Sequence, residues 1–307
     1  MFRLWPELSG EPELKLGLAI SGGPDSLAML LLAQAAIPGQ VEAATVDHRL
    51  RTEAADEAAL AGRLCDQLGV PHQTLRVTVA DGNLQASART ARYAALGTWA
   101  AARGIAALAT AHHADDQAET LLMRLNRGSG VAGLAGVRTR GIVPGSKIAL
   151  LRPVLSWRRA ELAQVLSGAG IAGAQDPSNK DERFDRVRIR RELADAPWID
   201  PVALAASASH LAEADVVLDW AAAREWHECV VSEGGVLRYI PSAPRAVRLR
   251  LVARIIAELG GSPRGGGVAH LVDLLEAGDA GSLGGIVAKV KGGAWVFQPE
   301  PPRSNPG

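Results

Sequence analysis

The first 127 residues alternate between short apolar segments and longer segments with helical patterning, and this alternation limits the possible fold more than any other feature. Four short apolar segments are expected to form strands, at residues 15–20, 41–46, 72–77 and 105–109. Expected helices follow them, at residues 26–36, 52–68, 84–103 and 114–127. Strands that alternate with helices predict an α/β fold, with a Rossmann-like parallel sheet that carries helices on both faces.

A change of pattern marks the segment that follows. The Gly-rich residues 128–145 are expected to form an ordered loop, because glycines are typical of irregular structure. A strand at 148–151 and a short helix at 158–167 should come next. The string PWIDP at 197–201 should then break the chain, because proline cannot continue a helix or a strand ladder.

This break sets the predicted domain organisation. The first domain covers residues 1–198 and includes an extension at about 150–198. Residues 199–297 should form a helical linker and a small α+β domain, and residues 298–307 a disordered tail. The elements expected in the second part are a long Ala-rich helix at 202–230, helices near 244–259 and 267–277, and strands near 236–240, 282–291 and 294–297.

The composition is that of an ordinary globular protein and excludes several classes. Apolar residues make up 48% of the 307 residues, too many for a disordered chain, and 33 basic side chains balance 33 acidic ones. No apolar run approaches the roughly 20 residues that span a bilayer. Because Cys65 and Cys229 form neither a metal-binding pair nor a disulfide framework, we expect a cytoplasmic location.

The end of the first expected strand carries a loop suited to phosphate. Glycines let a backbone approach a ligand closely, and a helix N-terminus presents free N–H groups to an anion. An ordinary strand-to-helix turn, with a serine as the helix cap, is the alternative. The complete string favours the phosphate loop, and its residues are Ser21, Gly22, Gly23, Pro24, Asp25 and Ser26.

Other nucleotide motifs fit less well. The P-loop of kinases and GTPases requires Gly-Lys, and the sequence contains no such pair. The string GSGVAG at 128–133 matches G-x-G-x-x-G, but it follows a helix, where dinucleotide binding requires a strand. The carboxylate of Asp25 beside a phosphate loop predicts a Mg²⁺ that bridges it to the phosphates of ATP, and a helix-capping role is the alternative.

A second polar cluster, AHHADDQAET at 111–120, follows the fourth expected strand and opens a helix. Because ligands bind at the carboxyl edge of such sheets, Asp116 is expected to hold the same Mg²⁺ as Asp25. His112 is expected to contact the reacting phosphate. The alternative is that the acids are ordinary helix caps and that His112 simply ends a strand. A metal hydrolase would need further ligands, which the sequence does not present.

The loop at 21–26 resembles that of the N-type ATP pyrophosphatases, which cleave ATP between the α and β phosphates. Further strings make the chain resemble one family of that superfamily, the tRNA(Ile)-lysidine synthetases. They are VDHRLR at 46–51, ARTARY at 88–93, HHADDQAETLLMRLNRGSGVAGLAG at 112–136, LRP at 151–153, DPSN at 176–179 and RVRIR at 186–190. The resemblance covers about residues 14–195 and weakens after about residue 200.

The resemblance implies a ligase that uses ATP and free L-lysine to modify the wobble cytidine of an isoleucine tRNA with a CAU anticodon. The cytidine O2 would attack the α-phosphate and release pyrophosphate, and the lysine ε-amine would then displace AMP from C2. Residues 21–26 would hold the phosphates, and Asp25 with Asp116 would hold Mg²⁺. Arg92 and His112 would stabilise charge on the α-phosphate. The family often forms homodimers, and it contacts tRNA through the extension and the second domain.

Some alternatives stay open at this level. The segment RFDRVRIRR at 183–191 suits contact with an RNA backbone, but it could equally be a surface helix paired to nearby acids. A tRNA thiolase of the same superfamily would commonly need clustered cysteines, which this chain lacks. A nucleotide-sensing or RNA-binding protein without activity could share the fold.

Overall fold

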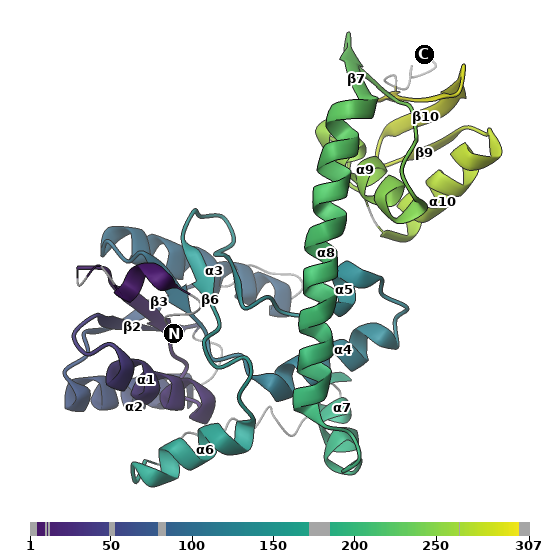
Figure 1. The fold of residues 1–307 in the computed structure, drawn as a ribbon. Helices are drawn as coiled ribbons and strands as arrows, with labels where there is room; N and C mark the ends of the chain where they lie inside the picture. Colours follow the sequence, from purple (N-terminus) through teal and green to yellow (C-terminus); the bar gives the residue numbers. More distant parts are fainter. Residues whose placement is uncertain are drawn as a thin grey trace, which may run out of the picture. The chain divides into compact units, whose positions relative to one another are not determined.

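The computed structural model describes residues 5–9, 11, 13–48, 53–78, 84–171, 185–263 and 265–300. The chain divides into two compact units, Met1–Ala212 and Glu213–Gly307, and the division falls inside helix α8 (Pro201–Cys229) (Figure 1). The break predicted at 197–201 lies at the start of this helix, and the predicted domain limits stay a prediction. No helix among the described residues is long and apolar enough to span a membrane.

The first unit contains a six-stranded sheet in the order β3-β2-β1-β4-β6-β5. Five strands run parallel and the edge strand β5 runs antiparallel to β6, which confirms the predicted α/β fold. The central strand β1 pairs with both β2 and β4, so the segments that follow β1 and β4 leave the sheet at the same edge. The strands are β1 (Leu16–Ala19), β2 (Val41–Asp47), β3 (His72–Arg76), β4 (Ala107–Ala109), β5 (Arg140–Ile142) and β6 (Ala149–Leu151).

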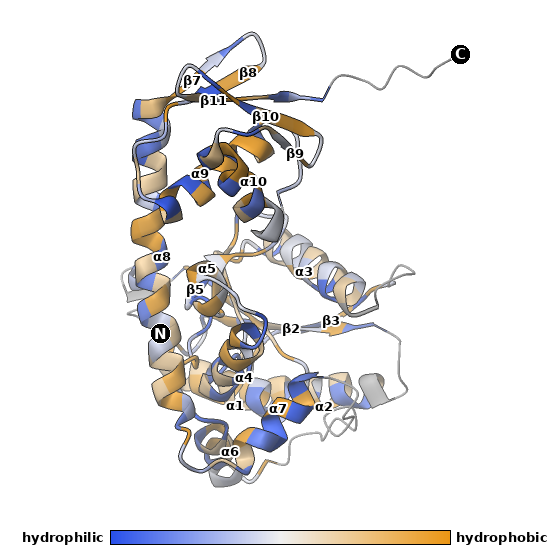
Figure 2. Cartoon of the chain, turned by 90° about the vertical axis from the view of Figure 1, so that its right-hand side faces the viewer, coloured by the Kyte–Doolittle hydropathy of each residue, from blue (hydrophilic) through white to orange (hydrophobic). Residues whose placement is uncertain are grey.

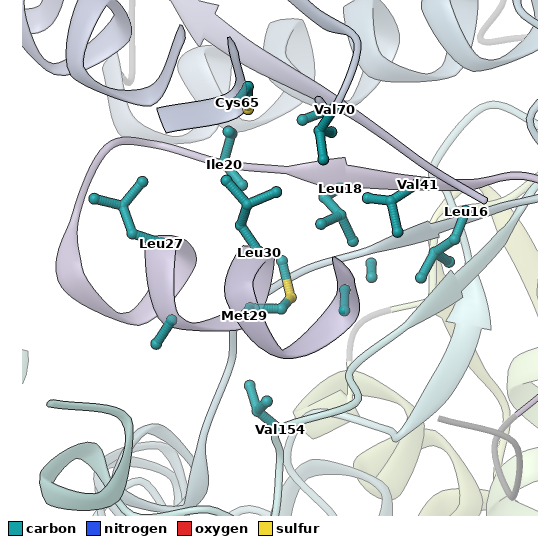
Figure 3. Packing of buried hydrophobic residues seen from close by; sticks show 14 of the residues in the cluster. Leu16, Leu18, Ile20, Leu27, Met29, Leu30, Val41, Cys65, Val70 and Val154 are labelled. Atoms are coloured by element: carbon teal, nitrogen blue, oxygen red, sulfur yellow. The ribbon is translucent and has the colours of Figure 1, made fainter. Parts of the chain in front are cut away.

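Helices cover both faces of this sheet. The side chains of Leu18 and Ile20 join a core with α1 and α2, whereas Ala19 joins a core with α3 on the other face. Figure 3 shows Leu18 and Ile20 on the side of the strand that faces Leu30 of α1. The helices of this unit are η1 (Pro6–Ser9), α1 (Pro24–Ala36), α2 (Glu53–Leu68), α3 (Leu84–Ala102), α4 (Ala114–Leu125), α5 (Val131–Leu134), α6 (Arg159–Gly168) and α7 (Asp185–Ala194).

Two predictions for this unit are wrong in detail. Helix α1 begins at Pro24 rather than at residue 26, because proline suits the first turn of a helix, where its missing N–H has no partner to lose. The segment 128–145, expected to be a loop throughout, contains α5 and β5. These elements have four and three residues, too few for a periodic pattern to reveal them. Residues 172–184 lie outside the described part of the chain.

The second unit is an antiparallel sheet that shares a core with two helices. Its strands follow the order β7-β8-β11-β10-β9, and inside the core Tyr239 and Trp295 meet edge to face. Figure 2 shows hydrophobic and hydrophilic residues on both helices, as expected where one side is buried. The elements are β7 (Val230–Glu233), β8 (Val236–Tyr239), α9 (Arg245–Glu258), α10 (Gly265–Ala277), β9 (Gly281–Leu283), β10 (Ile286–Lys291) and β11 (Ala294–Pro299).

The α+β prediction for this unit is confirmed, with three corrections. The single strand predicted at 282–291 is the hairpin β9–β10, because two glycines with φ values of +62° and +82° form a tight turn. Strand β7 was not predicted. The disordered tail does not start at Gln298, since this residue belongs to β11 and pairs with Val287. Residues 301–307 lie outside the described residues.

Candidate functional site

The loop between β1 and α1 is tied to itself by a serine. Ser26 Oγ donates a hydrogen bond to the carbonyl of Gly23 at 2.8 Å and accepts one from the backbone N–H of Ser21 at 3.1 Å. Gly23 occupies the N-cap position of α1, with Pro24 in the first turn and no side-chain cap. The structure therefore does not contain the serine-capped turn considered as an alternative, and Ser26 instead shapes the loop.

Gly22 holds a backbone conformation that requires glycine. Its φ is +83°, and a Cβ added there would lie 2.5 Å from the carbonyl oxygen of Glu57 in α2. Among the described residues, the backbone N–H groups of Gly22 and Asp25 have no protein acceptor. Because both lie at the N-terminus of α1, they are available to an anion.

Asp25 and Asp116 meet at the imidazole of His113. His113 is the N-cap of α4 and is 1% exposed. Its Nε2 lies 3.4 Å from Asp25 Oδ2 and 3.4 Å from Asp116 Oδ2. Asp116 completes a capping box, because the backbone N–H of His113 donates to its Oδ2 at 3.1 Å. The structure thus brings together the two carboxylates assigned to one cation and places a histidine between them.

The acids around His113 decide its charge. Burial alone would lower the pKa of His113, but contacts with Asp115 and Asp25 and the charge of Asp116 together raise it to about 9. Burial alone would raise the pKa of the Asp115 carboxyl. His113 and the backbone N–H of Arg159, which donates to Asp115 Oδ2 at 2.8 Å, instead hold that pKa well below its usual range.

The neighbouring acid, Glu119, is buried and bound by arginines of α7. Arg186 Nε donates to Glu119 Oε2 at 2.6 Å, and Arg190 Nε donates to Oε1 at 2.7 Å. The same Arg186 donates through Nη2 to Asp116 Oδ1 at 2.6 Å. Burial alone would raise the pKa of Glu119, but these two arginines lower it, so Glu119 is ionised. The bonds join α7 to α4 and bring Arg186 into the site.

Three arginines of α7, the described part of the segment 183–191, divide into two groups. Arg186 and Arg190 bind the buried acids of α4, whereas Arg188 is exposed and pairs with Asp185 of its own helix. Neither alternative considered for this segment describes all three of these arginines. The N–H groups with which Arg186 and Arg190 bind these acids are not available to an RNA backbone.

His112 lies among arginines rather than acids. Its Nδ1 is 2.9 Å from Thr110 Oγ1. Burial, followed by the charges of Arg152 and Arg92, lowers the pKa of His112 to about 3, so the imidazole is neutral near pH 7. The structure thus places Arg92, on α3, close enough to His112 to affect its charge, although the two residues come from different elements.

The arginines around His112 form a site suited to an anion. Arg89 and Arg92 flank the ring of Tyr93, with Cζ atoms 5.0 Å and 5.9 Å from its centroid. Burial lowers the pKa of Arg92 and of Arg152. Within the described part of the chain, none of these three arginines forms an ion pair with a carboxylate. Guanidinium groups held close together without acids favour a phosphate between them.

Sequence reasoning missed four residues of this site. His113 directly follows the predicted His112, and Glu119 lies one turn after the predicted Asp116 on the same helix. The capping-box spacing from 113 to 116 was the signal for the first of these. Arg152 and Arg186 come from distant segments. They fall in the strings at 151–153 and 186–190, but nothing in those strings shows that these side chains reach the site.

Neither cysteine is part of this cluster. Cys65 is buried in α2, where burial raises the pKa of its thiol to about 12, and Cys229 ends α8 in the second unit. A buried thiol with a raised pKa is a poor nucleophile. The positions of these cysteines do not fit the paired or clustered cysteines expected of a thiolase.

Comparisons with known proteins agree with this arrangement. Residues 5–196 match the model of the PP-loop domain, an ATP-binding family. Over 295 residues the chain is 48% identical to the tRNA(Ile)-lysidine synthase of Novosphingobium aromaticivorans, covering 95% of this chain and 90% of that protein. It is 41% identical to that of Zymomonas mobilis, covering 94% and 89%.

Among solved structures, the U34-tRNA thiolase NcsA from Methanococcus maripaludis is similar with a TM-score of 0.54 and 17% identity, over 66% of this chain and 72% of that one. Such low identity shows a shared fold alone. The two synthases, in contrast, are close relatives over nearly the whole chain. The protein therefore belongs to the tRNA(Ile)-lysidine synthase family.

Proposed function

We propose that this chain ligates L-lysine to C2 of the wobble cytidine of the isoleucine tRNA with a CAU anticodon, through an adenylated cytidine. The products are lysidine, AMP and pyrophosphate. The observation that carries this proposal is that a loop suited to phosphate, at 21–26, opens α1 directly beside the cluster of Asp25, His113 and Asp116.

In the first step the cytidine O2 attacks the α-phosphate of ATP, and the bond to pyrophosphate breaks. The free N–H groups of Gly22 and Asp25 would bind phosphate oxygens. Arg92 would neutralise charge that builds at the α-phosphate. His112 would act as a neutral partner rather than as a cation, because its pKa is lowered to about 3. Its Nε2 is the nitrogen left for the phosphate, since Nδ1 is bonded to Thr110.

In the second step the ε-amine of lysine attacks C2, loses a proton, and AMP departs with the former O2 oxygen. Negative charge again appears on the same phosphate, which makes the arginines around His112 useful in both steps. Recognition of the tRNA is assigned to the segment at about 150–198 and to residues 199–297. We also propose that the chain forms a homodimer. Light scattering on the purified chain tests this oligomeric state.

The residues present fit a Mg²⁺ ion. Asp25 Oδ1 is buried and has no hydrogen-bond partner among the described residues, and such an atom suits a cation. No group of three or more His, Cys, Asp or Glu side chains in the described chain could hold a metal. Two carboxylates suffice, because Mg²⁺ commonly takes its other ligands from phosphates and water. Asp25 and Asp116 would hold the ion, which would neutralise charge on the departing pyrophosphate.

The experiment that tests this function measures pyrophosphate release from ATP with purified protein, Mg²⁺, lysine and an isoleucine tRNA transcript that carries the CAU anticodon. A transcript with U in place of the wobble C is the matched control. We expect release that requires the C, together with radiolabelled lysine in the RNA. Release that does not depend on the C, or RNA without lysine, would contradict the proposal.

A further inference from the structure

His113 contacts the carboxylates of the site from a buried position. Its Nε2 is equidistant from Asp25 Oδ2 and Asp116 Oδ2, at 3.4 Å from each, while its Nδ1 lies 3.4 Å from the backbone nitrogen of Asp116 and 3.6 Å from Asp115 Oδ2. Nε2 carries a hydrogen both in the charged ring and in the neutral ring whose Nδ1 accepts, and it faces the two acids. These contacts are longer than well-formed hydrogen bonds.

The two acids come from different elements and need a reason to stay together. Asp25 is in the first turn of α1, Asp116 is in the first turn of α4, and two carboxylates repel each other. The Nε2–H group of His113 contacts one oxygen of each. The other oxygen of Asp25, Oδ1, is buried and has no hydrogen-bond partner among the described residues.

We propose that His113 is a positioning residue, which holds the Oδ2 atoms of Asp25 and Asp116 so that the two carboxylates are presented to one divalent cation. The proposal rests on the proposed function, which assigns these carboxylates to Mg²⁺. In this proposal His113 binds neither phosphate nor cation itself. It changes the affinity of the site for the metal through the two acids, because a group that is hydrogen-bonded to metal ligands orients them.

A purely structural role, as the cap of α4, is the competing explanation, and two substitutions separate the roles. In H113N the amide lies where Nδ1 lies, so the cap of Asp116 N–H is kept and the contact with Asp25 is lost. In H113Q the amide reaches the position of Nε2, so the contact with both acids is kept and the cap is weakened. H72N is the matched control, because the ring of His72 is partly buried in the same unit and contacts Thr45.

The measurement is the dissociation constant of α,β-methylene-ATP by calorimetry, once with Mg²⁺ and once with EDTA. Wild type and H72N should bind more tightly with Mg²⁺. H113N should lose about tenfold or more of this Mg²⁺-dependent tightening, while H113Q keeps most of it and affinity in EDTA changes little in any variant. Thermal unfolding checks that each variant is folded.

Full tightening in H113N, or equal loss in H113N and H113Q, would overturn the positioning role. Wild type that binds equally with Mg²⁺ and with EDTA would overturn both this role and the assignment of the carboxylates. The assay contains neither tRNA nor lysine. Normal tightening in a protein that forms no lysidine would therefore contradict the proposed function alone.

Discussion

Arg186 Nη2 lies 2.6 Å from Asp116 Oδ1, so that a residue of α7 is bonded to the first turn of α4 across 70 positions of sequence. The same guanidinium donates from Nε to Glu119, whose side chain is almost fully buried. An arginine whose guanidinium binds two carboxylates is held in one position. Arg186 therefore couples the docking of α7 to the geometry of the carboxylate cluster.

Replacing Arg186 by Gln should destabilise the first unit. Glu119 would stay buried and lose one of its charged donors, which costs about 1–3 kcal/mol, with the lower end expected because Arg186 is partly exposed. R188Q is the matched control on the same helix, since Arg188 is exposed and pairs with exposed Asp185. Its expected effect is below about 0.5 kcal/mol. Urea unfolding at pH 7 measures both, and equal losses would contradict the buried role of Arg186.

Replacing either carboxylate of the proposed Mg²⁺ site should remove activity without unfolding the chain. D25A and D116A are each expected to abolish pyrophosphate release, because each removes half of the protein's ligands to the ion. D56A is the control, since Asp56 is exposed on α2 in the same unit. Pyrophosphate release and circular dichroism are the measurements. Full activity in D25A or in D116A would remove that residue from the site.

Replacing Gly22 by Ala should weaken nucleotide binding, in addition to lowering the stability of the protein. The new Cβ would lie 2.5 Å from the Glu57 carbonyl, so the loop would have to move. Gly39 is a matched control, because its φ of +79° is similar and its surroundings are open. Both variants should lose about 1–2 kcal/mol to backbone strain. Calorimetry with α,β-methylene-ATP should show weaker binding in G22A alone, and unchanged binding there would contradict the role of the loop.

The sequence predicts most of the first sheet because its strands and helices are regular and alternate. The residues that lie at the ends of β1 and β4 could be assigned to one edge for the same reason, which brought Asp25 and Asp116 into one hypothesis. Short elements such as α5 and β5 could not be predicted, since three or four residues show no period.

The two adjacent histidines show where sequence reasoning stops. His112 and His113 are neighbours in the segment between β4 and α4, yet one lies among arginines and the other among acids. Successive side chains of an extended backbone point in opposite directions. The charged residues that the two rings meet include residues of α1, α3 and α7. Those elements are far apart in the sequence, so only the fold decides the charge of each ring.

The lowered pKa of His112 predicts a pH dependence of stability. The unfolded chain takes up a proton on His112 below about pH 6.5, whereas the folded protein does so only near pH 3. Protons therefore favour the unfolded state, and His112 costs stability as the pH falls from 6.5 towards 3. Relative to H112N, the wild type should lose about 1–2 kcal/mol between pH 7.5 and pH 5. Urea unfolding at both pH values measures this, with pH 8.5 as the control, where the difference should equal that at pH 7.5. A difference that does not change between pH 7.5 and pH 5 would show that His112 takes up its proton in the folded protein at an ordinary pH.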